Sequence, residues 1–350
     1  MSKAEAVEAH PGFPWLELDD PRGIEGFMRR RSWLADDERF VGCQKAGEGN
    51  MNLTLRVTTD RRTLILKQAR PWVEKYPRIP APWDRGRYEQ RFYERVSVIP
   101  AVAARMPRLI DADPEATSLL LEDLPGARDF NFVYQQPDIR DEEVADLATF
   151  LAVLHTATLG EPADGFANRD MRRLNHQHLF LVPLDEGNGI DLDSIEAGLA
   201  AAASRLWEDA AYRRLAEETG KRYLADGRCL VHGDFFPGSW LRTGAGVRVI
   251  DPEFCFCGDP EVDLGCVLAH FALAAIPRQL ASRFLETYTC TGGQAGLSPE
   301  WVARYAAIEV MRRLIGVAQL PLRSGKRLRA ELLARSRRAM LQENWERLWD

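Results

Sequence analysis

Two short segments of the sequence each end an apolar run with a carboxylate. The segment LVHGDFFPGSWL carries Asp234 and the segment VIDPEF carries Asp251, 17 positions further along the chain. Each apolar run predicts a strand, and the acid stands where that strand ends. Two carboxylates delivered by neighbouring strand ends suit phosphoryl transfer, because one can orient an acceptor hydroxyl while the other holds Mg²⁺ on the phosphates.

In this interpretation each polar residue of the two segments has its own task. Asp234 would act as the base, and Ser239 occupies the place, five positions later, where a kinase catalytic loop carries a metal-binding amide. In an extended segment Asp251 and Glu253 point to the same side, so both would face one metal cluster. The alternative is a capped turn around a buried, hydrogen-bonded aspartate. The pairing of the two motifs favours the catalytic interpretation.

Residues nearer the N-terminus are candidates for binding a nucleotide. Gly47, Gly49 and Asn50 belong to the turn GEGN, where glycines let the backbone approach phosphate oxygens closely. Lys67, in ILKQ, is expected to reach the phosphates, and Glu89 of the next helix would hold it by an ion pair. Taken singly, the glycines indicate an ordinary turn and the lysine an edge-strand residue pointing to water. Their order along the chain is the order that a kinase N-lobe requires.

The elements that must position these residues change in character along the chain. After a helical segment at 1–40, a mainly β part is followed by one linking strand and a mainly α part. The predicted elements are a hairpin at 53–57 and 63–69, a helix at 85–96, a strand at 117–124, a helix from Asp141, and helical segments at 190–224 and from about 260 onward. The proline-rich stretch at 70–84 predicts an ordered excursion or a mobile loop. The expected domains are an N-lobe at 1–120, a hinge at 121–126 and a C-lobe at 127–350.

Composition argues against several classes of protein. A net charge of −6 over 350 residues does not suit an electrostatic nucleic-acid binder. No apolar run reaches the length of about 18 residues that would predict a membrane span, and the N-terminus lacks the apolar core of a secretory signal. The six cysteines are sparse and fit reduced thiols, hence a cytoplasmic location. They include no CxxC pair, so zinc is not expected.

The motifs HGDFFPGS and VIDPEF resemble those of the 5-methylthioribose kinases, a branch of the aminoglycoside phosphotransferase and choline kinase superfamily. GEGNMNLTLRV resembles the family's glycine loop, LILKQARPWV its strand lysine, DRGRYE its glutamate helix, LLLEDL its hinge and MRRLIGVAQ its late substrate-side helix. The resemblance spans roughly residues 40–320. It implies an α+β, two-lobed protein-kinase-like fold, and transfer of the γ-phosphoryl of ATP, with Mg²⁺, to a hydroxyl of a small sugar-like acceptor. Methylthioribose is the leading candidate acceptor, and a homodimer is implied.

Some site residues follow from the resemblance alone. Backbone groups from Glu122 to Leu124 would hold the adenine, and Arg312 and Arg313 would contact the acceptor or stabilise the transferred phosphoryl. The alternative for the two arginines is a solvated helix face. Neighbouring residues on a helix point about 100° apart, so at most one of the two is expected to point straight at the cleft without bending.

Two segments depart from the family pattern. EKYPRIPAPWDR is proline-rich, with Trp83 displaced, and Phe235, Phe236 and Pro237 replace a polar pair beside the base. The replaced positions beside the base are expected on the acceptor side. The departures leave open another pentose, an amino alcohol or an aminoglycoside as the acceptor. A nucleotide-binding regulator without turnover is the alternative from a different class.

The histidines receive structural interpretations. His155, on an apolar helix, is expected to be a satisfied core residue. His232 is expected to hydrogen-bond the backbone around the catalytic loop. His176 and His178 are expected to be polar loop residues, because no third metal ligand lies near them in the sequence.

Overall fold

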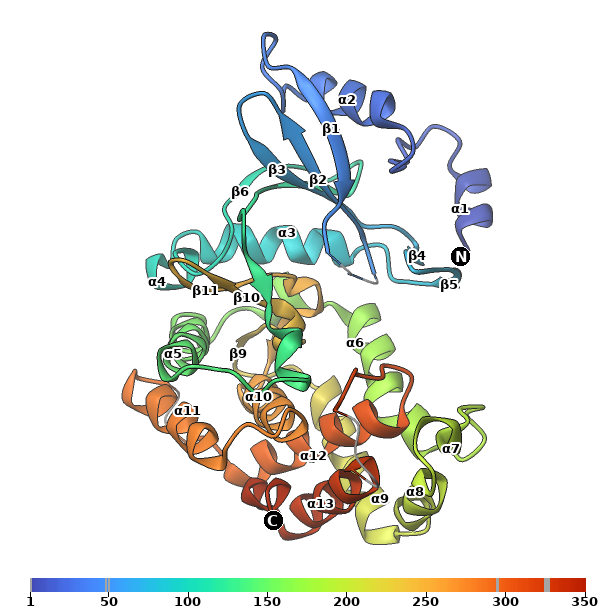
Figure 1. Cartoon of the computed structure of the whole chain (residues 1–350), viewed down its shortest axis with the longest axis vertical. Coiled ribbons are helices and arrows are strands. Elements are labelled where there is room, and N and C mark those ends of the chain that lie inside the picture. The colour runs from blue at the N-terminus through green and yellow to red at the C-terminus, as the bar shows by residue number, and fades with distance from the viewer. Residues whose placement is uncertain (1, 48, 50, 294–295, 324–327) are drawn as a thin grey trace. The chain divides into compact units, whose positions relative to one another are not determined.

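The fold is described from a computed structural model, which covers residues 2–47, 49, 51–293, 296–323 and 328–350 (Figure 1). Its contacts divide the chain into two units. The first comprises Met1–Ala127 and Asp251–Phe254, and the second comprises Arg128–Ile250 and Cys255–Asp350. The short segment that carries Asp251 therefore belongs by its contacts to the first unit.

The first unit is built on a five-stranded antiparallel sheet with the strand order β1-β2-β3-β7-β6. The predicted hairpin is confirmed as β2 and β3, and the predicted strand at 117–124 is confirmed as β7, which pairs with both β3 and β6. The bounds are β1 Phe40–Lys45, β2 Leu53–Thr59, β3 Thr63–Gln68, β6 Leu109–Asp113 and β7 Ser118–Glu122, with the helices α1 Lys3–Ala9, α2 Pro21–Arg30, α3 Arg85–Val96 and α4 Pro100–Ala103.

Alternation along β2 and β3 decides which helix covers which face of this sheet. Leu53, Leu55 and Val57 alternate with less buried residues and pack with Leu64 and Leu66 in one core. Helix α2 contributes its buried stripe to the same core; this stripe is Ile24, Phe27 and Met28. Lys67 has the opposite parity on β3, and it contacts α3, the helix predicted at 85–96. The lysine therefore lies on the α3 face of the sheet.

The stretch at 70–84 contains a short two-stranded sheet. Strands β4 (Trp72–Val73) and β5 (Tyr76–Pro80) pair in antiparallel fashion, so part of the predicted excursion is regular structure. Trp83 is fixed from two sides. Its indole N–H lies 3.1 Å from the carbonyl oxygen of Ala69, and its ring stacks on Trp15 with centroids 5.5 Å apart.

The second unit is mainly helical. Every residue of α10 is buried, and α12 packs along it. The helix predicted from Asp141 is confirmed as α5, while the segment predicted at 190–224 divides into α7, α8 and α9. The bounds are α5 Asp141–Ala157, α6 Arg169–His176, α7 Leu192–Ile195, α8 Leu199–Trp207, α9 Ala210–Leu224, α10 Glu261–Leu273, α11 Arg278–Cys290, α12 Pro299–Ile315 and α13 Leu328–Gln342.

Short strands of the second unit carry the two motifs, but they are not paired with each other. Strand β9 (Cys229–Val231) pairs with β12 (Phe256–Gly258), whereas β11 (Gly246–Val249) pairs with β10 (Trp240–Thr243), which also pairs with β8 (Arg128–Asp129). The loop after β9 and the strand β10 intervene, and they place β9 and β11 in different sheets. The ends of the two strands are nevertheless neighbours, as predicted, because His232, directly after β9, contacts the carbonyl oxygen of Ile250, directly after β11, at 3.0 Å.

His176 and His178 were wrongly predicted to lie in a loop. His176 ends α6, and His178 lies in a single π-helical turn, Gln177–Leu181, that continues from it. The α+β class itself is confirmed, with the sheet in the N-terminal unit and the helices concentrated in the C-terminal one. Within the described part of the chain, no helix combines the length and apolarity needed to cross a membrane.

Candidate active site

Lys67 is held between two carboxylates in the first unit. Its Nζ donates to Oε1 of Glu89 and to Oδ1 of Asp251, each at 2.7 Å. The expected ion pair with Glu89 is therefore formed, and the interpretation of Lys67 as an edge-strand residue in water is wrong. Strand β3 lies between β2 and β7, and the lysine side chain is only 4% exposed.

Burial and charge compete at this triad. Burial alone would lower the pKa of the Lys67 ammonium, but Asp251 and Glu89 together raise that pKa well above its ordinary value. Burial raises the pKa of Glu89, and the lysine opposes this effect. Asp251 remains 44% exposed, so its carboxylate can still be reached from solvent.

The segment that begins at Asp251 was predicted to be extended, and this prediction is wrong. Asp251 has a left-handed backbone with φ of 62°, and Pro252–Phe254 forms a 3₁₀ turn. Glu253 instead points at Arg85 and Asn52, whose Nε and Nδ2 atoms lie 3.0 and 2.9 Å from its Oε2. The two acids therefore have separate cationic partners, and this difference follows from the backbone turn between them.

Arg85 joins three segments of the first unit through one buried guanidinium. It is fully buried and, besides Glu253, it donates to the Asn52 side chain and to three carbonyl oxygens, those of Met51, Arg70 and Pro82. The sequence analysis missed both Arg85 and Asn52. An arginine at the start of a helix gives no sign in sequence that it is buried.

The glycine turn lies between β1 and β2. Gly47 has φ of +77°, and a Cβ on Gly47 or Gly49 would meet no atom within 4 Å. The space beside both residues is therefore open. Asn50 lies outside the described residues.

The predicted adenine-binding backbone follows β7. The Glu122 carboxylate accepts from the backbone N–H of Arg108 at 3.1 Å, and the Leu124 carbonyl accepts from Ala127 at 3.1 Å. Between them, the buried Asp123 pairs with Arg56 at 2.9 Å. This pair fixes the segment to β2.

The loop after β9, which carries Asp234, is held by a carboxylate of α10. The Asp263 carboxylate accepts from the backbone N–H groups of His232 and Gly233, at 2.8 and 2.9 Å, and lies 3.1 Å from the ring of His155. His155 is wholly buried and satisfied, as predicted. His232 contacts the carbonyl oxygen of Ile250 at 3.0 Å, as expected. Asp263 itself was missed, although an aspartate inside an apolar helix signals a buried polar contact.

Ser239 is placed to stabilise this loop. Its side chain is 2% exposed, and its hydroxyl donates to the backbone carbonyl of Asp234 at 3.0 Å. A hydroxyl that donates to a carbonyl in this way closes the loop on itself.

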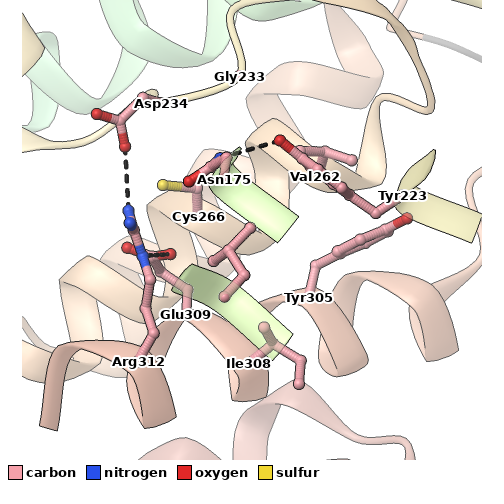
Figure 2. Close-up of a pocket in the computed structure, with 11 residues that line it drawn as sticks. Asn175, Tyr223, Gly233, Asp234, Val262, Cys266, Tyr305, Ile308, Glu309 and Arg312 are labelled. Carbon is pink, nitrogen blue, oxygen red and sulfur yellow. Dashed lines mark hydrogen bonds and ion pairs between the residues drawn. The ribbon is translucent and has the colours of Figure 1, made fainter. Parts of the chain in front are cut away.

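Asp234 is bound by both members of the arginine pair. The Oδ1 atom of Asp234 lies 3.1 Å from a terminal nitrogen of Arg312 and 3.6 Å from one of Arg313 (Figure 2 shows the Arg312 contact). Both guanidiniums therefore reach one carboxylate oxygen, although neighbouring residues on a helix point about 100° apart. Glu309, three and four positions earlier, accepts from both Nε atoms, at 2.6 and 2.8 Å, and so draws the two long side chains together.

A cluster of residues of metal-ligand type lies beside these arginines, and no motif in the sequence indicates it. Among the described residues, ligand atoms of Cys266, His270 and Glu309 all lie within 4.8 Å of one another. Glu309 is already neutralised by Arg312 and Arg313, and burial raises the pKa of the Cys266 thiol well above its ordinary value. A further cation would have to displace two guanidiniums, so the donor set does not suit a resident metal.

A small cavity adjoins Asp234 in the second unit (Figure 2). Its free volume is about 20 Å³, enough for roughly one water. Its walls are mixed, and the lining residues are Asn175, Leu179, Tyr223, Gly233, Asp234, Val262, Cys266, Tyr305, Ile308, Glu309 and Arg312. Among the described residues, the Tyr305 hydroxyl is buried without a hydrogen-bond partner.

The two phenylalanines of the segment FFPGSW have different surroundings. Phe235 is wholly buried and stacks on Phe150, with centroids 5.6 Å apart, so its expected place on the acceptor side is wrong. Phe236 lies against the Arg313 guanidinium at 4.7 Å and against His270. Of the two phenylalanines, Phe236 is the one that contacts the arginine group.

Comparison with known proteins gives a consistent picture. Residues 42–301 match the family described as "Phosphotransferase enzyme family". A methylthioribose kinase of Exiguobacterium sibiricum is 27% identical over 251 residues, which cover 68% of this chain and 62% of that protein. The methylthioribose kinase of Bacillus cereus strain AH187 is 24% identical over 323 residues and 80% of each chain. This chain thus spans less than two thirds of the first relative's length.

A solved structure with a similar fold is that of LicA in complex with AMP. It is 16% identical, with a TM-score of 0.52, and the match covers 93% of this chain and 99% of that one. At this identity the likeness concerns the fold, and it agrees with the predicted protein-kinase-like class.

Proposed function

We propose that this chain, which belongs to the phosphotransferase enzyme family, is a kinase that uses ATP and Mg²⁺ to phosphorylate a hydroxyl of a small sugar-like alcohol. The leading candidate acceptor is 5-methylthioribose, the substrate in the names of the two relatives. The domain limits predicted at 120 and 121–126, the cytoplasmic location and a homodimer belong to the same proposal.

The observation that carries the proposal is the environment of Asp234. Its carboxylate lies beside a cavity, on a loop whose N–H groups are fixed by Asp263, and it faces two guanidiniums. In the proposed mechanism Asp234 orients the acceptor hydroxyl and takes its proton as the phosphoryl group is transferred in line. Arg312 and Arg313 then stabilise charge on the transferred group.

In this proposal, residues of the first unit bind the nucleotide. Lys67, oriented by Glu89, would bind the phosphates, and Gly47, Gly49 and Asn50 would approach them with backbone N–H groups. The backbone from Glu122 to Leu124 would hold the adenine. Backbone N–H groups and the fixed ammonium of Lys67 together suit a polyphosphate, because they supply hydrogen-bond donors and positive charge.

The proposed Mg²⁺ sites differ in how well their residues fit the ion. Asp251 fits, because it is a partly exposed carboxylate and Mg²⁺ prefers oxygen ligands. Glu253 fits less well, since one of its oxygens already accepts from Arg85 and Asn52, and Ser239 does not fit, because its buried hydroxyl donates within the loop. When bound, Mg²⁺ would supply neutralising charge on the phosphate oxygens.

The charges around the cavity favour a neutral acceptor over a cationic one. Two guanidiniums and two carboxylates balance beside it, so no surplus negative charge remains to attract an amino alcohol or an aminoglycoside. The cavity has room for about one water, so a pentose requires the side chains that line it to move.

ADP release with Mg-ATP, measured across a panel of alcohols, tests the proposal. The panel comprises methylthioribose, ribose, other pentoses, choline, homoserine and aminoglycosides, and we expect turnover with methylthioribose or another neutral sugar. Asp234→Asn should abolish that turnover and leave ATP binding intact. Turnover of choline or an aminoglycoside alone would overturn the acceptor class. Nucleotide binding without turnover of any acceptor would favour the non-catalytic regulator.

A further inference from the structure

Helix geometry alone does not explain why Arg312 and Arg313 converge on one oxygen atom. Their Cα–Cβ bonds point about 100° apart, yet their terminal nitrogens lie 3.1 and 3.6 Å from Oδ1 of Asp234. We propose that Glu309 is the positioning residue that aims both guanidiniums at Asp234, and that His270 fixes the Glu309 carboxylate. The importance of this for turnover rests on the proposed function, but the positioning itself can be tested without turnover.

The spacing of Glu309 suits this role. On a helix, residues three and four positions apart lie on the same face, so Glu309 neighbours both Arg312 and Arg313. Its Oε2 holds the Nε of Arg312 at 2.6 Å, and its Oε1 holds the Nε of Arg313 at 2.8 Å. Because the Nε atoms are occupied, the terminal nitrogens remain to meet Asp234.

A second hydrogen-bond chain fixes Glu309 from α10. His270 Nε2 lies 2.9 Å from Oε1 of Glu309, and His270 Nδ1 lies 2.6 Å from the Tyr134 hydroxyl. Burial lowers the pKa of His270 to about 4, so the ring is neutral near pH 7. Burial would raise the pKa of Glu309, but the two guanidiniums lower it well below its ordinary value. The carboxylate therefore only accepts.

These charge states assign the protons in the hydrogen-bond chain of Tyr134, His270 and Glu309. His270 carries its proton on Nε2 and donates it to Glu309, so Nδ1 accepts from Tyr134. Burial raises the pKa of Tyr134 well above its ordinary value, and the hydroxyl keeps its proton. The Phe236 ring, against both Arg313 and His270, limits sideways movement of the group.

The charge balance makes Glu309 hard to replace. Asp234, Glu309, Arg312 and Arg313 sum to zero beside a neutral His270. Without Glu309, two adjacent buried guanidiniums would share one carboxylate, and like charges in a buried site repel strongly. Glutamine at this position keeps the shape but offers one acceptor oxygen instead of two.

The direct test is ¹⁵N NMR of arginine Nε–H groups in the full-length protein, with Arg312→Lys and Arg313→Lys used for assignment. We expect the Nε–H signals of both arginines to be protected from exchange in the wild type. Protection should persist in the matched control Glu300→Gln, which alters an exposed carboxylate of the same helix. At least one of the two signals should be lost in Glu309→Gln. Unchanged protection of both in Glu309→Gln would overturn the proposal.

Kinetics supply the second measurement. Glu309→Gln should lower kcat by about tenfold or more while the KM for ATP stays within about twofold, and Glu309→Asp should recover part of the loss. In the Arg312→Lys/Arg313→Lys background the same Glu309→Gln change should cost less than about threefold. A full further loss in that background would mean that Glu309 acts by some other route, and the proposal would fail.

Two complications are covered by these variants. If Glu309→Gln does not fold, Glu309→Asp answers the NMR question, because the shorter side chain cannot hold both Nε atoms; retained protection of both would count against the proposal. If the wild type phosphorylates no acceptor, the proposed function fails, and the NMR result still decides the role of Glu309.

Discussion

Lys67 donates to the carboxylate of Asp251 across 2.7 Å, although 184 positions separate them in the sequence. The contact joins the central strand of the N-terminal sheet to the segment of the VIDPEF motif. Lys67 also pairs with Glu89, so the position of one ammonium depends on two anions. Removing either anion should shift the lysine toward the other.

Glu89→Gln is therefore expected to weaken use of ATP. The lysine loses a charge-assisted hydrogen bond worth about 1.5–3 kcal/mol, so kcat/KM for ATP should fall roughly 10–100-fold. Steady-state kinetics with varied ATP provide the measurement. The matched control is Glu94→Gln, an exposed glutamate on the same helix, and an equal effect of both changes would contradict the role of Glu89.

Arg85→Lys is expected to destabilise the protein. The guanidinium donates to five oxygens, whereas an ammonium has three donors and lacks the planar fork. Loss of a buried, hydrogen-bonded charge partner costs about 3–5 kcal/mol when the pair is broken outright, and we expect about half of that here. Urea unfolding measures the change. Arg87→Lys, exposed on the same helix, should change the unfolding free energy little.

Gly47→Ala tests the backbone of the glycine turn. The φ of +77° costs an alanine about 1–2 kcal/mol, so the free energy of unfolding should fall by about 1 kcal/mol. A Cβ meets no atom there, and the cost is therefore conformational and not steric. Urea unfolding of the wild type and Gly47→Ala measures the change, and an unchanged free energy of unfolding would contradict the conformational cost.

Stability should decline with acidity because of His270. Burial lowers its pKa from 6.5 to about 4 in the folded state. Between these values the unfolded chain binds the proton and the folded chain does not. The contribution of His270 to the free energy of unfolding is therefore fully present above pH 6.5 and is lost as the pH falls toward 4. The slope should approach about 1.4 kcal/mol per pH unit.

Unfolding of wild type and His270→Gln from pH 7.5 to 4.5 checks this pH dependence. His176 and His178 also have lowered pKa values because of burial, and they add to the slope in the same direction. The variant should retain their share and lose that of His270. An identical slope in both proteins would contradict the assignment.

Local pattern was enough to predict some elements of the fold, and not others such as the short sheet of β4 and β5. The alternation of Leu53, Leu55 and Val57 identified the hairpin, and the acids at the start of α5 marked its first residue. Sheet membership was not predictable in the same way. That β9 and β11 lie in different sheets depends on contacts with β12 and β10, and these contacts have no local signature.

The candidate site was predictable at the level of motifs and, apart from the Lys67–Glu89 pair, mostly not at the level of partners. Asp234, Lys67 and Glu89 stood out by type and order. Glu309 and Arg85 did not, because a charged residue on a helix is usually solvent-exposed and only tertiary packing buries these two. The turn at Asp251 was missed because a left-handed aspartate is a rare backbone state.

The return of Asp251–Phe254 to the first unit limits how the gene can be divided. A fragment that stops at Ala127 would keep Lys67 and Arg85 but lose Asp251, one of the two acids paired with Lys67, and Glu253, which pairs with Arg85. Such a fragment would carry two buried cations with incomplete partners. The N-terminal unit is therefore not a portable module, and grafting it onto another chain would require the peptide Asp251–Phe254 to be supplied as well.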